Sequence, residues 1–359
     1  MSSSSARYCA TRIIPANRPL ERTELGSYEK LKVLSSSISH MPLHAVFRDS
    51  GVTEKHGFEL ELDVAKVPQR GKPTRTIGER AQLLLSGEYQ FLSGLHHEPY
   101  VYRARGDRRL AFLAQTQNHW DDRLICSADI HEPKQLEGKR ILTGLAPCVQ
   151  GNLRQALERA GVDPAKVEFV LASRDGEGAD SRLAVGPSSI DRVSRRDVDA
   201  ANVDMPFDLQ AKKRGLNAIE LPALPVIHNT TICANMDFVR ANEETTVTFL
   251  KALIEAVHFF KTEKQKSCAI IAREVAPLIG LDGDDEIEYL HGQWSVLLCP
   301  KPYPAPMAVT NLYELDVAHD PLANSIAPLE VWDTHYVRMI DDSGFIDALY
   351  HQTRISQFD

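Results

Sequence analysis

The sequence contains no long run of apolar residues. Near its start the longest such run is Ile13-Ile14, which Pro15 interrupts, whereas a secretory signal has roughly 7–15 apolar residues after a basic start. No other stretch approaches the roughly 18 apolar residues that a membrane-spanning helix needs. We therefore expect a protein that is neither exported nor inserted into a membrane, and we predict a cytoplasmic location.

Cysteines are few and follow no pattern. The six are Cys9, Cys126, Cys148, Cys233, Cys268 and Cys299. None lies in a C-x-x-C motif or at zinc-finger spacing from a histidine. Scattered cysteines in a large acidic chain are typical of a reducing compartment, so the sequence indicates free thiols rather than a disulfide framework.

Positive charge is not in excess either. The chain has 41 Lys and Arg against 49 Asp and Glu, a formal net charge of −8. Proteins that bind the nucleic-acid backbone concentrate positive charge, so we expect no nucleic-acid partner. The 43% hydrophobic and 25% charged residues are ordinary for a globular protein, and 359 residues favour two domains.

The predicted elements form two successive α/β units. Residues 1–30 are polar and predicted to be an N-terminal arm. A strand at 31–34, a helix opened by Pro42 and an alternating strand at 58–64 make a β-α-β unit, typical of a parallel sheet. Strands at 89–92 and 110–116 extend it. The strand–helix pattern restarts after a strand at 124–127, which we expect to lead out of the first unit.

The chain is then expected to return to the first unit. A strand at 230–235 is followed by a long amphipathic helix at 245–262 and further helices. We therefore predict a discontinuous lobe one (residues 31–127 and 229–359) and an inserted lobe two (residues 128–228). Two connections between two α/β lobes predict a hinge and a central cleft.

Four segments resemble a known family in their order and spacing. They are PLHAVF with GFELEL (42–62), LLSGEYQF (84–91), LEGKRI (136–141) and RRDVDAA (195–201). They resemble the type II periplasmic-binding-protein fold, in its nitrate/sulfonate/taurine-binding and THI5/NMT1-like branch. Gln90 and Arg196 depart from the usual Asp and Gly. The resemblance spans residues 31–300 and implies two α/β lobes with a hinge and a central cleft.

The resemblance implies two kinds of function. Most members are ligand-binding subunits of ABC importers, but relatives include THI5-type pyrimidine synthases, aromatic desulfinases and dihydroxyphthalate-type decarboxylases. The returning strand has only Cys233 where THI5-type enzymes have a cysteine cluster, and loop 35–40 lacks the desulfinase cysteine. We predict a cofactor-free lyase, decarboxylase-like, that acts on a small aromatic acid. The alternative is an importer subunit or sensor that binds such an acid without turnover.

Loops after the strands supply the candidate site, because ligands in open α/β sheets lie outside the carboxyl ends of the strands. The start of the helix after strand 138–142 attracts an anion and lowers the pKa of a thiol in its first turn. The predicted partner is a small anionic organic ligand. The sequence is compatible with an oligomer as well as with a monomer. The predicted substrate-binding residues are Ser39, Ser93, Gly94, Tyr100, His119, Trp120, Arg123, Thr143, Gly144, Cys148, Gln150, His228 and Asn229.

Histidine is the usual general acid near neutral pH. We predict that one of His40, His96 and His97 donates a proton to the substrate carbon as carbon dioxide leaves. His44 lies inside a predicted helix and is expected to be structural. We expect no cofactor and no metal, because the set His96, His97, Glu98 and His119 contains adjacent residues that converge poorly on one ion.

Overall fold

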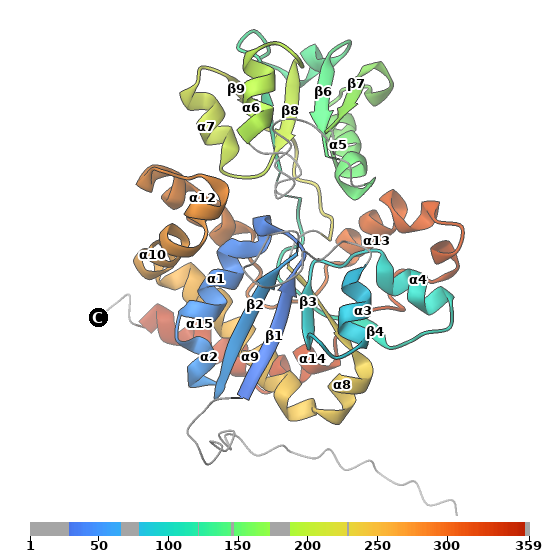
Figure 1. Cartoon of the computed structure of the whole chain (residues 1–359), viewed down its shortest axis with the longest axis vertical. Coiled ribbons are helices and arrows are strands. Elements are labelled where there is room, and N and C mark those ends of the chain that lie inside the picture. The colour runs from blue at the N-terminus through green and yellow to red at the C-terminus, as the bar shows by residue number, and fades with distance from the viewer. Residues whose placement is uncertain are drawn as a thin grey trace, which may run out of the picture.

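The computed structural model describes residues 29–65, 79–120, 122–144, 147–172, 187–227 and 230–355. These residues form two α/β lobes, one above the other along the long axis of the molecule (Figure 1). Each lobe contains a five-stranded sheet, so the predicted two-lobed α/β class is confirmed. Nearly all of the predicted N-terminal arm lies outside the described residues.

The sheet of lobe one is mixed. It consists of β1 (Glu29–Ser35), β2 (Phe58–Val64), β3 (Phe91–Ser93), β4 (Leu110–Gln115) and β10 (Thr231–Asn235), in the order β2-β1-β3-β10-β4. β1 runs parallel to β2 and β3, as the predicted β-α-β unit requires. β10, the strand on which the chain returns, runs antiparallel to β3 and β4.

The sheet of lobe two is also mixed. It consists of β5 (Arg123–Cys126), β6 (Arg140–Thr143), β7 (Glu168–Leu171), β8 (Ala200–Val203) and β9 (Asn217–Ile219), in the order β7-β6-β8-β5-β9. The boundary expected at residue 127 assigned β5 to lobe one. Instead β5 pairs with β8 and β9, because Leu124 and Cys126 belong to the core of lobe two.

Helices cover both faces of each sheet. Those of lobe one are α1 (Met41–Asp49), α2 (Val52–Lys55), α3 (Arg80–Leu85), α4 (Glu98–Ala104), α8 (Met236–Ala241), α9 (Glu243–Thr262), α10 (Lys264–Glu274), α11 (Ala276–Ile279), α12 (Asp284–Leu297), α14 (His335–Asp342) and α15 (Phe345–Ile355). Those of lobe two are α5 (Pro147–Arg159), α6 (Pro187–Ser194) and α7 (Phe207–Lys213). The 3-10 turns nearest the cleft are η1 (Ile38–His40), η5 (Val317–His319) and η6 (Ala323–Ser325).

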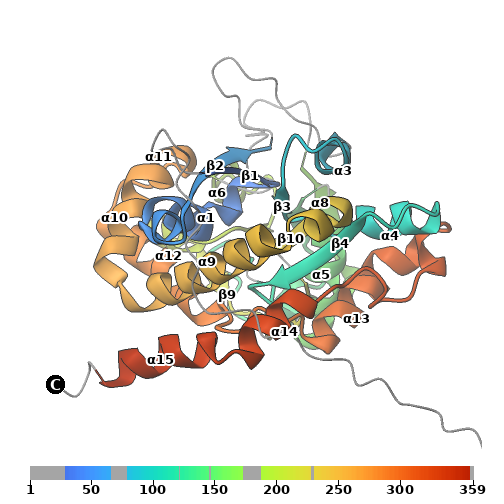
Figure 2. The same ribbon diagram turned by 90° about the horizontal axis from the view of Figure 1, so that it is seen from below.

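The long helix α9 organises the core of lobe one. It runs between α1 on one side and α14 and α15 on the other (Figure 2). Its Phe249 stacks on Phe91 of β3 with ring centroids 3.7 Å apart and meets Phe47 of α1 edge to face at 5.4 Å. The apolar face predicted for residues 245–262 therefore packs against the sheet.

Helix α13 (Pro306–Leu315) was not predicted. The Pro-rich stretch before it is not helical, as expected, but Pro306 occupies the first turn, where proline is tolerated. Ala308, Val309 and Leu312 of α13 join the core of lobe two. A segment expected to belong wholly to lobe one therefore contributes a helix to the other lobe.

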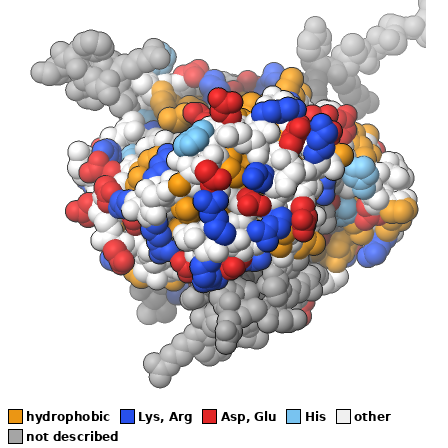
Figure 3. Space-filling view, turned by 90° about the horizontal axis from the view of Figure 1, so that it is seen from above, with side chains coloured by type: hydrophobic (Ala, Val, Ile, Leu, Met, Phe, Trp, Pro, Cys, Tyr) orange, Lys and Arg blue, Asp and Glu red, His pale blue; other side chains and the backbone are white. Residues whose placement is uncertain are grey.

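The surface mixes charges of both signs. At the outer end of lobe two, Lys and Arg side chains alternate with Asp and Glu side chains, and no area of a single sign stands out on this face (Figure 3). Within the described ranges, no helix is long and apolar enough to span a membrane.

Three chain segments cross between the lobes and bond to one another. The first crossing follows β4 and the second precedes β10. The two are bonded to each other, because the Trp120 amide donates to the Leu224 carbonyl at 3.0 Å and the Val226 amide donates to the Asn118 carbonyl at 3.1 Å. The third crossing leads into α13. The side chain of Asn118 bonds the first crossing to the third. Its Nδ2 donates to the Tyr303 carbonyl at 2.9 Å, and its Oδ1 accepts from the Ala305 amide at 2.8 Å.

Replacing Asn118 by alanine tests this three-segment hinge. The change leaves the Tyr303 carbonyl and the Ala305 amide without their partner, and we expect a loss of about 1–3 kcal/mol in the free energy of unfolding. Urea unfolding followed by circular dichroism measures it. Asn324→Ala, on an exposed turn, is the matched control, with an expected change within about 0.5 kcal/mol. Equal stabilities for the two variants would contradict the role of Asn118.

Candidate functional site

The carboxyl ends of β1 and β3 meet the start of β10 at one edge of the lobe-one sheet. The Ser36 amide donates to the Ser93 carbonyl, and the Gly94 amide donates to the Thr231 carbonyl, both at 2.9 Å. The predicted residues Ser93 and Gly94 therefore lie at the sheet edge where α/β proteins bind ligands.

Gly94 allows a close approach of the next loop. Its φ of 91° lies in the left-handed region, and a Cβ at this position would collide with the side chains of Ser36 and His40. Only glycine meets both conditions. The ring of His40 consequently packs directly against the turn that follows β3.

His40 and His44 form a buried pair of imidazoles. Their rings are 6.5 Å apart, edge to face, and are 3% and 1% exposed. Neither ring nitrogen of His44 has a hydrogen-bond partner among the described residues. Burial lowers the pKa of His44 to about 4, so this ring is neutral near pH 7, as expected of a structural residue. His40 ends η1 and begins α1, directly after Ser39, which faces the space between the lobes.

His97 is held by two carboxylates. Its Nε2 lies 2.8 Å from Asp320 and its Nδ1 3.3 Å from Asp316. The hydrogen bond to Asp316 leads the effects that raise the pKa of His97 to about 9, against a smaller opposing effect of burial. The catalytic role predicted for His97 is not supported, because both ring nitrogens already serve an ion pair. This pair ties the loop after β3 to the segment after α13.

Tyr100 and His119, both predicted to contact the ligand, have different environments. Tyr100 lies in the core of lobe one, and its hydroxyl donates to the Pro328 carbonyl at 2.7 Å. Burial raises the pKa of this hydroxyl well above its usual value. His119 is exposed on the first crossing, bridged to Pro225. In the loop after β3, the predicted residues His96 and His97 are both partly exposed.

The carboxyl edge of the lobe-two sheet carries several predicted residues. Thr143 ends β6 and is fully buried, Gly144 follows it, and Cys148 and Gln150 lie in the first turns of α5. Trp120 is 7% exposed and lies in the core of this lobe. His228 and Asn229, also predicted, lie outside the described residues.

The environment of Cys148 is the reverse of the one expected. The start of α5 was predicted to lower the pKa of this thiol. Burial, with the negative charges of Asp316 and Asp122, instead raises it to about 12. Backbone hydrogen bonds oppose this only weakly. Cys148 therefore remains a neutral thiol at physiological pH and is unsuited to act as a nucleophile.

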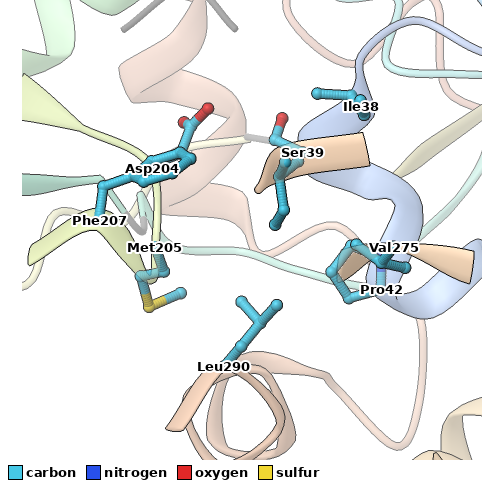
Figure 4. Close-up of a pocket in the computed structure, with 9 residues that line it drawn as sticks. Ile38, Ser39, Pro42, Asp204, Met205, Phe207, Val275 and Leu290 are labelled. Atoms are coloured by element: carbon cyan, nitrogen blue, oxygen red, sulfur yellow. The ribbon is translucent and has the colours of Figure 1, made fainter. Parts of the chain in front are cut away.

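A small hollow opens between the lobes (Figure 4). The empty space among its lining atoms is about 240 Å³, which includes space open to solvent. Ser39 and Asp204 provide its polar atoms and the rest of the lining is apolar. The lining residues are Ile38, Ser39, Pro42, Asp204, Met205, Phe207, Val275, Ile279 and Leu290.

Beside this hollow, α7 and α12 hold the lobes together. The Tyr289 hydroxyl donates to Asp208 at 2.5 Å, and Lys213 lies 3.1 Å from Glu286. On the same side Arg123 of β5 donates to Gln293 at 2.8 Å. Arg123, predicted to contact the ligand, thus contacts lobe one.

A family model for NMT1/THI5-like proteins matches residues 61–266, more than half of the chain. The chain belongs to this family. The resemblance inferred from the sequence segments is therefore confirmed. No curated protein matches the sequence.

Solved structures show the same fold at low sequence identity. The sulfonate-binding protein SsuA of Methylobacillus flagellatus KT is 13% identical, with a TM-score of 0.61 over 89% of this chain and 96% of that one. The nitrate-binding protein NrtA of Synechocystis PCC 6803 is 14% identical, with a TM-score of 0.61 over 88% and 89%. The desulfurization enzyme DSZB is 16% identical, with a TM-score of 0.58 over 88% and 99%. The periplasmic-binding-protein fold is thereby confirmed.

Three residues that line the hollow from lobe two of this NMT1/THI5-like chain were not predicted. Asp204, Met205 and Phe207 line the hollow but follow a strand that was only coarsely located. Asn152 and Asn202 are buried polar residues in α5 and β8. The sequence feature that could have indicated Asn202 is an asparagine within an otherwise apolar strand, AANV. Within the described part of the chain, no group of three His, Cys, Asp or Glu side chains is placed to hold a metal ion.

The ion pair of His97 predicts a pH-dependent contribution to stability. Its pKa rises from 6.5 to about 9 on folding, so the contribution is complete below pH 6.5 and disappears as the pH rises through 9. We expect the difference in melting temperature between wild type and His97→Gln to be large near pH 6 and small near pH 10. Exposed His335→Gln is the control, with a small difference throughout. A difference for His97→Gln that grows with pH would contradict the ion pair.

Proposed function

We propose that this chain binds a small organic acid in the cleft between its lobes. The observation that carries the proposal is the hollow of about 240 Å³ lined from both lobes. On its lobe-one wall, Ser39 lies in a turn rich in hydroxyl groups, with its Oγ 2.8 Å from that of Ser37. Hydroxyl groups beside the start of a helix suit a carboxylate, and the apolar lining suits its hydrocarbon part.

Charge sets the orientation of the acid in this proposal. Asp204 on the opposite wall repels a carboxylate, so the carboxylate is placed at Ser39 and His40 on lobe one. The structural relatives support an anionic ligand, since two of them are named for binding sulfonate and nitrate.

We further propose that the bound acid is decarboxylated without a cofactor. In this step the bond between the carboxylate and its carbon breaks, and carbon dioxide leaves. The electron pair stays on that carbon, which takes a proton from His40. The position of His40 at the cleft edge against Gly94 favours this candidate, and the high pKa of Cys148 argues against a thiolate alternative. We propose a cytoplasmic setting for this reaction.

Ligand binding is tested by a thermal-shift screen of aromatic and aliphatic carboxylic acids. We expect at least one acid to raise the melting temperature by several degrees at saturating concentration. The corresponding uncharged amides are the control and should give no shift, because they lack the anion. Equal shifts for acids and amides would contradict an acid-binding site.

Turnover is tested by measuring carbon dioxide released from each acid that binds. His40→Asn is expected to keep binding within a few-fold but to lower the rate by about 100-fold or more, since a positioned general acid contributes 10²–10⁴-fold. His335→Asn, on an exposed helix start, should leave the rate unchanged. Binding of every acid without carbon dioxide release would identify a binding protein rather than a lyase.

A further inference from the structure

Four buried side chains of lobe two carry polar atoms without a hydrogen-bond partner in the residues that the structure describes. The atoms are Trp120 Nε1, Thr143 Oγ1, Asn202 Oδ1 and both amide atoms of Asn152. None of these residues is more than 7% exposed. Buried polar groups in folded proteins are nearly always paired, so these atoms have a hydrogen-bonding capacity that a ligand or water can satisfy.

Thr143 and Asn202 lie side by side on the sheet. Thr143 ends β6 and Asn202 is the last residue but one of the neighbouring parallel strand β8. The register pairs Leu142 with Ala201, so the next residues, Thr143 and Asn202, face the same side of the sheet. Asn202 also donates from Nδ2 to Asp122 at 2.8 Å. The three side chains therefore share the carboxyl edge of the lobe-two sheet, where the cleft begins.

Asn152 approaches this edge from the opposing helix. It precedes Ala156 by one turn of α5, and Ala156 packs with Ile141 of β6 in the core of lobe two. Asn152 is thereby on the sheet-facing side of α5 and is 1% exposed. Trp120 belongs to the same core cluster. The unpaired atoms of Thr143, Asn202 and Asn152 therefore lie on the side of the sheet that α5 covers.

The unpaired atoms include donors and acceptors. Trp120 Nε1 and the amide nitrogen of Asn152 donate, whereas the amide oxygens of Asn152 and Asn202 accept, and this balance holds for Asn152 whichever way its amide is turned. A carboxylate only accepts and an ammonium group only donates, but a hydroxyl does both. Asp122 and Asp316 add negative charge nearby, which also opposes a second anion.

We propose that these side chains bind an uncharged hydroxyl group at the end of the ligand remote from its carboxylate. The proposal rests on the proposed acid-binding function and adds the substrate class, a hydroxy-substituted organic acid. The carboxylate lies at Ser39 on lobe one and the hydroxyl at Thr143, Asn152 and Asn202 on lobe two. The ligand then bridges the cleft with opposite ends on different lobes.

Matched acids test the far end of the ligand. Benzoate is the parent acid. Opposite its carboxylate, 4-hydroxybenzoate adds a hydroxyl, terephthalate a second carboxylate and 4-(aminomethyl)benzoate an ammonium group. Butyrate and 4-hydroxybutyrate repeat the comparison on an aliphatic chain. Calorimetric titration is expected to show that the hydroxy acid of at least one pair binds about tenfold or more tightly than its parent. We expect terephthalate and the ammonium acid to bind more weakly than 4-hydroxybenzoate.

Two variants link the preference to the cluster. Thr143→Val and Asn152→Leu remove hydrogen-bonding atoms at similar size, and we expect each to reduce the preference for the hydroxy acid to within about twofold while leaving the affinity for the parent acid similar. Ser267→Ala removes another buried hydroxyl without a partner in the described residues, on α10 of lobe one. It should keep the full preference.

The outcomes separate this proposal from the acid-binding function. Tight binding of a parent acid with no gain from the hydroxyl would overturn the hydroxyl site but support acid binding, and the cluster would then hold water only. A preference unchanged in both variants would also overturn it. Failure of every acid to bind would overturn the proposed function and the hydroxyl site with it.

Discussion

Both connections between the sheets run from one carboxyl edge to the other, and this constraint shapes the whole molecule. β4 ends at the carboxyl edge of its sheet, and β5 starts at the carboxyl edge of the other, where Arg123 pairs with the last residue of β8. On the return, Thr231 of β10 pairs with Gln115 at the end of β4. A strand entered from that edge must run against its neighbours, which explains why β5 and β10 are the antiparallel members. The crossings therefore lie in the cleft, and the site between the lobes is built around the hinge.

The two walls of the cleft differ in charge. Lobe one offers the hydroxyl groups of the turn after β1 and the imidazole of His40. Lobe two offers the carboxylate of Asp204, together with the apolar side chains of Met205 and Phe207. A net acidic chain can therefore present an anion-compatible wall, provided that its acidic groups at the cleft lie on the other lobe. In the proposed function, this division gives the bound acid a single orientation, which a proton transfer at one carbon requires.

The sequence predicted the layout better than the chemistry. Local patterns located strands and helices because alternation and helical spacing record burial, and β2 agrees with its prediction residue for residue. The roles of His97, Tyr100 and Cys148 depended on long-range contacts that no local pattern contains: Asp316 and Asp320 lie more than 200 residues from His97 along the chain. Asn152 and Asn202 were not predicted because they lie within a helix and a strand, whereas ligand contacts were expected in the loops after the strands. Helix α13 was missed because its core partners lie in the lobe from which the chain had already returned.

In the proposed function, a site that decarboxylates an acid needs only one group more than a site that binds it. Bound acid needs a carboxylate contact and a matched far end; decarboxylation adds a proton donor beside the carbon that loses carbon dioxide. His40 lies beside the proposed carboxylate site, while His44 behind it is kept neutral by burial. A neutral neighbour does not oppose protonation of His40, whereas a charged one would. In the proposed reaction, His40 carries the proton when a ligand anion lies next to it. The negative carboxylate of an acid bound in this orientation favours the protonated form of His40. Binding of the acid and protonation of His40 are therefore linked in the proposed reaction.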